Sequence, residues 1–224
     1  MKPVDQVGVI VQARLSSQRC PQKMIKPFCD TTLMDICLSK LVASKIDNKN
    51  IWVSVYEPEL ITVCKKYPIN IFHRSHKSAM SEGTPMTEIY EWWNKIPLQY
   101  IVLVNACAPF LSIKTIENFY DDYCSIPDNG LFGVIEKKNY YWNFQDKLLT
   151  PVDEAVMNTK TAQPIKEAAH CLYASKLSSI GNNIWMGDFS KYQDIKLYTL
   201  PEEECFDIDY EWQFNLAQKL YCHE

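Results

Sequence analysis

Short apolar runs recur along this chain of 224 residues, and segments with helical spacing of apolar residues separate them. No polar face alternates through the first run, as is typical of a strand that is buried on both sides. The alternation of runs and helical segments predicts an α/β fold with a mostly parallel sheet covered by helices. The predicted strands are Val7–Val11, Ile51–Val55, Ile69–Phe72, Tyr100–Val104 and Leu131–Ile135. The predicted helices are Leu33–Lys45, a helix from Pro58, Met86–Trp93 and Ile113–Tyr123.

The pattern changes near residue 140, where irregular segments separate shorter apolar stretches. Later the chain is expected to return to the sheet and then to close with an amphipathic helix. Because no repeat or linker interrupts it, residues 1–224 are predicted to form a single domain with a smaller subregion at 140–175. Short strands are expected at Tyr140–Phe144, Leu148–Thr150 and Ala168–Tyr173, sheet strands at Ile195–Thr199 and Phe206–Asp209, and the last helix at Tyr210–Leu220.

A polar, cationic segment follows the first strand and contains Arg14, Ser17, Arg19 and Lys23. In open α/β sheets, ligands bind at the carboxyl ends of the strands, where this segment begins. Arginine forms forked hydrogen bonds to phosphate oxygens, and lysine adds a mobile point charge. The segment therefore predicts a polyphosphate site, with a solvated basic loop as the alternative.

Two carboxylates, Asp207 and Asp209, stand one residue apart just before the last helix. In an extended segment both point to the same side, and Ile208 points to the other. Two adjacent carboxylates repel each other unless a divalent cation lies between them and a phosphate. The pair therefore predicts a metal site, with a helix cap and a surface acid as the alternative.

Composition narrows the possible functions. With 6 glycines, the chain contains no glycine-rich dinucleotide or P-loop motif, and its net charge of −4 disfavours binding of nucleic acid through broad positive charge. The nine cysteines are odd in number and scattered, which predicts reduced thiols in a cytoplasmic protein. No signal peptide or membrane span is expected from the sequence.

The basic segment, with its A-R-x-x-S-x-R-x-P-x-K pattern and following K-P-F, resembles the opening signature of sugar nucleotidyltransferases. The resemblance is to the acylneuraminate cytidylyltransferase family, and it extends to the D-I-D motif at Asp207–Asp209. It implies a three-layer, Rossmann-like sheet with helices on both faces and a small β-rich insertion. It also implies that residues 140–175 form a sugar-side and dimerisation subregion of a homodimer.

The same resemblance implies a cytoplasmic enzyme of nucleotide-sugar biosynthesis for cell-surface polysaccharide. It would transfer CMP from CTP to an acidic, sialic-acid-like or 2-keto-3-deoxy sugar and release pyrophosphate. The catalytic residues implied are Arg14 and Lys23, and the magnesium ligands are Asp207 and Asp209. The sugar-binding residues implied are Asn105 and Tyr173. The nucleotide-binding residues implied are Ala13, Arg14, Ser17, Arg19, Lys23, Arg74 and Ala79.

Several positions depart from the family pattern. Leu15 and Ser16 replace two small glycines, Met24 replaces an asparagine that helps read cytosine, and Asn105–Ala108 replaces Gln-Pro-Thr-Ser. Two alternatives therefore stay open. One is a nucleotidyltransferase that uses another base or sugar, and the other is a catalytically silent paralogue that binds a nucleotide or sugar.

Overall fold

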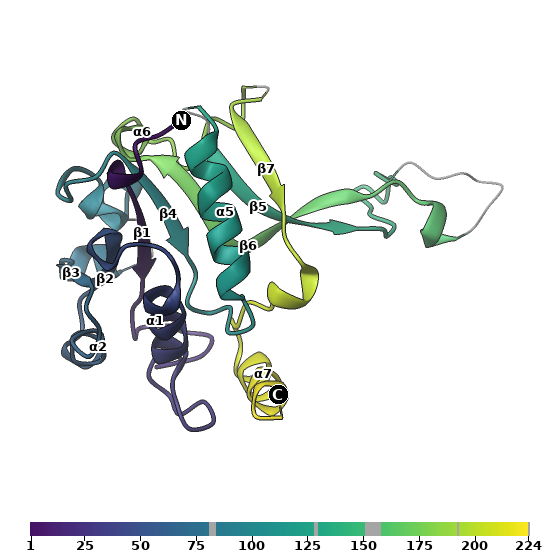
Figure 1. The fold of residues 1–224 in the computed structure, drawn as a ribbon. Coiled ribbons are helices and arrows are strands. Elements are labelled where there is room, and N and C mark those ends of the chain that lie inside the picture. The colour runs from purple at the N-terminus through teal and green to yellow at the C-terminus, as the bar shows by residue number, and fades with distance from the viewer. Residues whose placement is uncertain (81–83, 128–129, 151–157, 192, 224) are drawn as a thin grey trace.

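The computed structural model describes residues 1–80, 84–127, 130–150, 158–191 and 193–223. At its centre is a seven-stranded sheet with the order β3-β2-β1-β4-β6-β5-β7 (Figure 1). The strands are β1 Val7–Gln12, β2 Ile51–Val55, β3 Asn70–His73, β4 Tyr100–Val104, β5 Gly130–Lys137, β6 Ile165–Lys176 and β7 Ile195–Thr199. The helices are α1 Leu33–Ala43, α2 Pro58–Cys64, α3 His76–Ala79, α4 Met86–Ile89, α5 Ile113–Ser125, α6 Leu177–Gly181 and α7 Glu211–Tyr221.

The sheet is mostly parallel, as the sequence predicted. Strands β3, β2, β1 and β4 pair in parallel, and β7 pairs in parallel with β5. Strand β6 is inserted between β4 and β5 and runs antiparallel to both. The carboxyl ends of β1 and β4 therefore meet at one edge of the sheet, and the amino-terminal half of β6 lies beside them.

Helices cover both faces of the sheet, which confirms the predicted α/β class. The larger core packs helices α1 and α5 against one face and includes residues such as Leu38 and Phe119. The smaller core, on the other face, contains Ile10, Trp92 and Leu177 and is covered by α6 and the 3-10 turn Glu91–Asn94. Strand β1 contributes to both cores, which explains its uninterrupted apolar run.

The helix predicted over Met86–Trp93 is interrupted. Helix α4 ends at Ile89, Tyr90 leaves the helical conformation, and a 3-10 turn follows. The rings of Tyr90 and Trp92 lie 5.1 and 6.2 Å from that of Trp185. Two residues that are two positions apart point to nearly opposite sides of a regular helix, so the break lets both rings reach Trp185.

Three strand predictions are wrong. The segment Phe206–Asp209 is extended but joins no strand, because its contact with the sheet edge is a bond from the backbone N–H of Ile208 to the carbonyl of Cys107. The stretches predicted as strands at 140–144 and 148–150 form one isolated bridge between Trp142 and Leu148. Residues 168–173 do form a strand, as part of β6.

The β5–β6 pair runs on beyond the other strands and leads into an arm that projects from the molecule (Figure 1). The described residues of the arm are 138–150 and 158–164. Three large apolar side chains of the arm are exposed, namely Trp142, Phe144 and Leu149. Residues 151–157 of the subregion predicted at 140–175 lie outside the described residues. The roles predicted for this subregion remain predictions.

The expectation that every cysteine is a reduced thiol is wrong for one pair. A disulfide joins Cys29 to Cys222, which are 193 positions apart in the sequence. The sequence gives no spacing signal for this bond, because only folding brings the two residues together. Separately, the described helices include none that is long and apolar enough to cross a bilayer.

Candidate active site

A cleft with two chambers opens at the carboxyl end of strand β1. The first chamber has a volume of about 380 Å³ and the second about 210 Å³. Gln12, Ala13 and Arg14 line both chambers, so the end of β1 separates them. The first chamber is also lined by Ser17, Gln18, Arg19, Lys23, Met24, Cys107 and Asp209. The second is also lined by Arg74, Ser78, Ala79, Met80 and Ile89.

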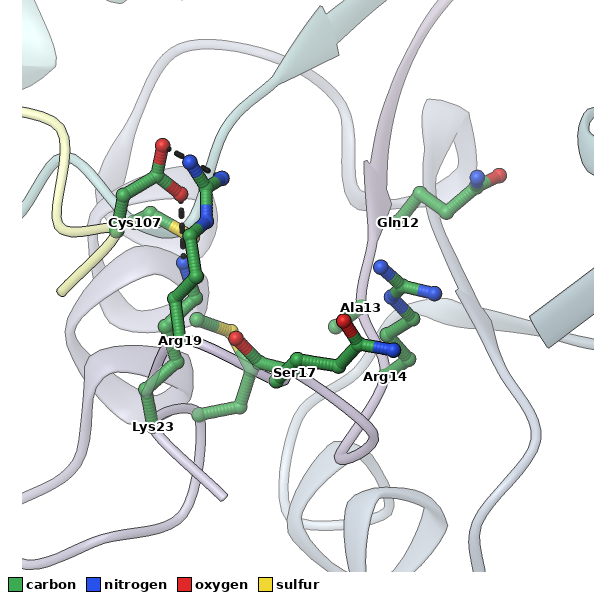
Figure 2. Close-up of a pocket in the computed structure, with 10 residues that line it drawn as sticks. Gln12, Ala13, Arg14, Ser17, Arg19, Lys23 and Cys107 are labelled. Atoms are coloured by element: carbon green, nitrogen blue, oxygen red, sulfur yellow. Dashed lines mark hydrogen bonds and ion pairs between the residues drawn. The ribbon is translucent and has the colours of Figure 1, made fainter. Parts of the chain in front are cut away.

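The basic segment wraps around the first chamber as a compact loop. Gln22 adopts a left-handed backbone conformation with φ of 56°, and its N–H donates to the carbonyl of Leu15. The backbone N–H of Leu15 in turn donates to Glu57 at 2.8 Å. These bonds turn Arg19 and Lys23 towards one side of the cavity and leave Gln12 and Arg14 on the other (Figure 2).

The cationic and acidic segments meet across the first chamber. Nζ of Lys23 donates to the carbonyl oxygen of Ile208 at 2.5 Å and lies 3.4 Å from a carboxylate oxygen of Asp209. The other carboxylate oxygen of Asp209 pairs with the guanidinium of Arg19 at 2.8 Å. Burial alone would lower the pKa of Lys23, but the neighbouring Cys107, Asp209 and Asp207 raise it, so Lys23 stays charged.

Asp207 lies behind Asp209 and is held by Asn105. The amide nitrogen of Asn105 donates to Asp207 at 3.2 Å and to the carbonyl of His170 at 2.9 Å. Burial raises the pKa of the Asp207 carboxyl, and the negative charge of Asp209 raises it further. A cation bound beside Asp207 and Asp209 would stabilise the ionised carboxyl and so oppose both increases in its pKa.

These two carboxylates fit a magnesium ion that is shared with a bound polyphosphate. Magnesium in proteins is commonly held by one or two carboxylates, with substrate phosphates and water completing its octahedron. Within the described ranges, no group of three or more His, Cys, Asp or Glu side chains could hold a metal by itself. Asp207 and Asp209 therefore suit a shared site better than a closed structural site.

The second chamber is shaped by Arg74, which is buried, and by the turn after β3. The Arg74 Nε donates to the hydroxyl of Ser78 at 3.0 Å, and its Nη2 donates to the carbonyl of the same residue. Burial lowers the pKa of Arg74 to about 10, so it remains a cation at neutral pH. The Arg14 guanidinium donates to the carbonyl of Ala79 at 3.3 Å and closes the wall between the chambers.

The predicted sugar-binding residues lie next to the cleft and do not line either chamber. Tyr173 packs edge-on against Phe132 at 5.0 Å between ring centroids, and its hydroxyl lies 2.8 Å from Nδ1 of His170. His170 has a left-handed backbone with φ of 56°, and the proximity of its imidazole acts to lower the pKa of Asp207, against the effect of burial. A network of Asn105, His170 and Tyr173 thus borders the carboxylates on the side away from Arg14.

Several cleft residues were not assigned a role from the sequence. Gln12 is the last residue of β1, and Cys107 follows β4. A polar or small residue at the end of an apolar strand could therefore have indicated both cleft positions from the sequence. Met24 lines the first chamber with its side chain almost fully buried. His170 gave no signal, because its left-handed conformation depends on pairing between distant strands.

Comparison with known proteins identifies the family. A model of the cytidylyltransferase family matches residues 8–177, which is most of the chain. The chain belongs to the cytidylyltransferase family. The family assignment makes the protein a CTP-using nucleotidyltransferase enzyme, and it confirms the resemblance at the family level. None of the curated proteins matches the sequence significantly.

Solved cytidylyltransferase structures share the fold at low sequence identity. CMP:2-keto-3-deoxy-manno-octonic acid synthetase in complex with CTP superposes with a TM-score of 0.69 at 11% identity, covering 97% of this chain and 99% of that one. A cytidylyltransferase from Leptospira borgpetersenii serovar Hardjo-bovis (strain JB197) superposes with a TM-score of 0.63 at 17% identity, covering 98% of this chain and 87% of that one. The 4-diphosphocytidyl-2C-methyl-D-erythritol synthase from Anaerococcus prevotii DSM 20548 superposes with a TM-score of 0.67 at 11% identity, covering 97% of this chain and 96% of that one.

Proposed function

We propose that this cytidylyltransferase transfers CMP from CTP to a hydroxyl of an acidic sugar of the 2-keto-3-deoxy class and releases pyrophosphate. The observation that carries the proposal is the meeting of Lys23 and Arg19 with Asp209 beside Asp207, at the carboxyl ends of β1 and β4. The similarity over 99% of the length of a CMP:2-keto-3-deoxy-manno-octonic acid synthetase supports the class of sugar.

The triphosphate fits the first chamber, and the base fits the second. Arg14, Arg19 and Lys23 would neutralise phosphate oxygens, and Ser17 would donate a hydrogen bond. Ala79 and the buried Arg74 line the chamber where the cytosine ring would bind. Because Arg14 lines both chambers, it stands where the ribose would join base and phosphates.

In the reaction, the acceptor hydroxyl attacks the α-phosphorus and gives up its proton to solvent, and the bond to the pyrophosphate oxygen breaks. Arg14 and Lys23 would stabilise the negative charge that grows on the phosphate oxygens, because they are fixed in place before the reaction begins. Lys23 is held between the carbonyl of Ile208 and Asp209, which reduces its freedom to reorient. A magnesium ion bound by Asp207 and Asp209 would supply further charge neutralisation at the phosphates.

The acceptor would bind beside Asp207, against Asn105 and the pair formed by His170 and Tyr173. Burial raises the pKa of Tyr173, so its phenol stays protonated and can donate or accept a hydrogen bond. The imidazole of His170 is exposed and can present its other nitrogen to a sugar oxygen. These groups suit an acceptor that carries many oxygens.

A second acceptor class is supported by the similarity to 4-diphosphocytidyl-2C-methyl-D-erythritol synthase, which covers 96% of that chain. Such an acceptor would be a polyol phosphate, with an alkyl phosphate in place of a sugar carboxylate.

The exposed apolar side chains of the arm support a homodimer, because Trp142, Phe144 and Leu149 are 57, 104 and 57% exposed. A second copy is the partner that we propose for these side chains.

A screen for pyrophosphate release tests the proposal. Each of the four nucleoside triphosphates is combined with 3-deoxy-manno-octulosonic acid, N-acetylneuraminic acid or methylerythritol phosphate, with and without magnesium. We expect release with CTP, magnesium and an acidic sugar. Release with methylerythritol phosphate alone would replace the acidic sugar by the second acceptor class, and no release with any acceptor would contradict both.

A further inference from the structure

Gln12 occupies a position from which it can read the nucleotide base. It ends β1, it lines both chambers, and its side chain points to the same side of the strand as that of Arg14 (Figure 2). None of the roles assigned above uses it. Met24, which stands where the family pattern has a base-reading asparagine, has no hydrogen-bonding group that could distinguish one pyrimidine from another.

Trp92 fixes the orientation of the Gln12 amide. The indole Nε1 of Trp92 lies 2.7 Å from the side-chain oxygen of Gln12. An indole N–H can only donate, so the atom that faces it must be the amide oxygen. Trp92 is itself completely buried in the smaller core, so packing holds the indole that contacts Gln12.

This clamp leaves the amide nitrogen as the group that Gln12 can offer to a ligand. The amide nitrogen has no hydrogen-bond partner among the described residues. Arg74 and Ser78, which line the second chamber with Gln12, bond to each other. Ala79, Met80 and Ile89 line the same chamber and provide apolar surface for the faces of a flat ring.

We propose that Gln12 is a specificity-determining residue, whose amide nitrogen donates a hydrogen bond to N3 of the cytosine ring. N3 is an acceptor in cytosine, whereas in uracil the same position carries an N–H donor. Facing a fixed donor, uracil would leave two donors opposed and unpaired, and a buried site that is built to pair one group rejects an analogue that lacks it. Trp92 would act as the positioning residue, because it prevents the amide from turning over.

The proposal goes beyond the acceptor discussed above and depends only on the use of CTP. Its test is therefore equilibrium binding of CTP and of UTP, each with magnesium and without any acceptor, measured by titration calorimetry. The measured quantity is the ratio of the two dissociation constants. A screen that finds no acceptor would leave this ratio measurable, so the two proposals fail separately.

Gln12→Leu should lower the preference for CTP over UTP by about tenfold or more, which is the size of discrimination that one well-placed base contact gives. Gln12→Glu should move the preference towards UTP, because its second carboxylate oxygen can only accept and would pair with the N3–H of uracil. The ratio corrects for any loss of affinity that the added negative charge causes for both nucleotides.

Trp92→Phe should also lower the preference, because the freed amide can present its oxygen as well as its nitrogen. Trp93→Phe is the matched control, since this neighbouring tryptophan packs near Gly181 and does not line the cleft. The melting temperature of each variant separates loss of fold from loss of discrimination. The Gln12 variants change a residue at a strand end, so they keep the test decisive if Trp92→Phe does not fold.

The proposal is overturned if the wild-type protein binds CTP and UTP equally, or if Gln12→Leu keeps the wild-type ratio. If Gln12→Leu loses discrimination and Trp92→Phe keeps it, the base contact is supported and the positioning role of Trp92 is overturned. Loss of discrimination in both variants, with the wild-type ratio kept in Trp93→Phe, supports the whole proposal.

Discussion

The proposed phosphate side of the cleft, around Arg19 and Lys23, and the proposed acceptor side, around Asn105 and His170, are held in place by different means. On the phosphate side, the basic loop is bound to the C-terminal segment by the ion pairs of Arg19 and Lys23 with Asp209, by that of Lys26 with Glu211, and by the Cys29–Cys222 disulfide. On the acceptor side, a few hydrogen bonds around Asn105 and His170 join a bulged strand to Asp207. A site for a highly charged ligand needs fixed charges, whereas a site for a hydroxyl-bearing acceptor can use neutral hydrogen-bonding groups.

An irregularity in the pairing of β6 with β5 shapes the proposed acceptor side. Phe132 pairs with Tyr173 and Val134 with Ala168, so the residues between them on β6 bulge opposite Gly133. A Cβ atom on Gly133 would lie 2.9 Å from the carbonyl oxygen of Leu172, so glycine is needed where the bulge approaches. Bulges of this kind redirect side chains next to functional sites.

The largest effect that we expect concerns the phosphate side. Lys23→Ala should slow turnover about a hundredfold or more, because removal of one preorganised charge costs on the order of 3 kcal/mol of barrier. Steady-state pyrophosphate release measures it. Lys26→Ala is the matched control: Lys26 pairs with Glu211 and does not line the cavity, so its turnover should stay within about threefold of wild type. Near-normal turnover of Lys23→Ala would contradict the assigned role.

Removal of the disulfide should lower the free energy of unfolding by about 3 kcal/mol in the oxidised protein, because the bond restricts the unfolded chain. Cys29→Ser and Cys222→Ser should behave alike in urea denaturation. Dithiothreitol should destabilise the wild type and leave both variants unchanged. Phe28 still packs against Phe214 and Tyr221 at 5.3 and 5.4 Å, so turnover should fall by less than about twofold. Equal stability of wild type and variants would show that the bond contributes nothing.

Asp207 and Asp209 should respond oppositely when each is replaced by asparagine. The folded state raises the pKa of Asp207, so it holds a proton more tightly than the unfolded state, and stability falls as pH rises through that range. Asp207→Asn should therefore raise the free energy of unfolding at pH 7 by about 1 kcal/mol, while activity is lost. Asp209→Asn should lower it by a smaller amount, since the side chains of Arg19 and Asp209 in this ion pair are 54 and 34% exposed.

Urea denaturation at pH 7 without magnesium measures both variants. The same measurement at acidic pH, where Asp207 is protonated in both states, should remove the gain from Asp207→Asn. Destabilisation by both substitutions would show that burial of Asp207 carries no cost in the folded protein.

The smallest effect on monomer stability is expected in the arm. Phe144→Ser should change the free energy of unfolding by less than about 0.5 kcal/mol, because the side chain is fully exposed. It should, however, weaken dimerisation measured by sedimentation if the arm binds a second copy. Phe189→Ser, which also changes an exposed phenylalanine but outside the arm, is the control. An unchanged dimer, or a monomeric wild type, would contradict the proposed partner.

Local sequence signals predicted most of the helices and strands that surround the end of β1. The β-branched runs and capped helices gave β1, β2, α1 and α5 to within a few residues, because these elements are decided by apolar spacing and by caps such as Thr32. The polar residues Arg14, Arg19 and Lys23 after a buried strand indicated a ligand site for the same local reason.

Other features could not be predicted from short stretches of the sequence. The antiparallel placement of β6, the break at Tyr90 and the extended path of Phe206–Asp209 depend on which distant surfaces are available for packing. Such long-range choices are decided by the whole core, and neighbouring residues carry little information about them.

By itself, then, the sequence determined an α/β sheet with a cationic loop after its first strand and an acidic pair before its last helix. Only the tertiary structure decided that Trp92 clamps Gln12, that Cys29 meets Cys222 and that His170 bulges beside Asp207. The physical reason is distance along the chain: each of these contacts joins residues that no helix or strand period relates, so it exists only once the sheet has assembled.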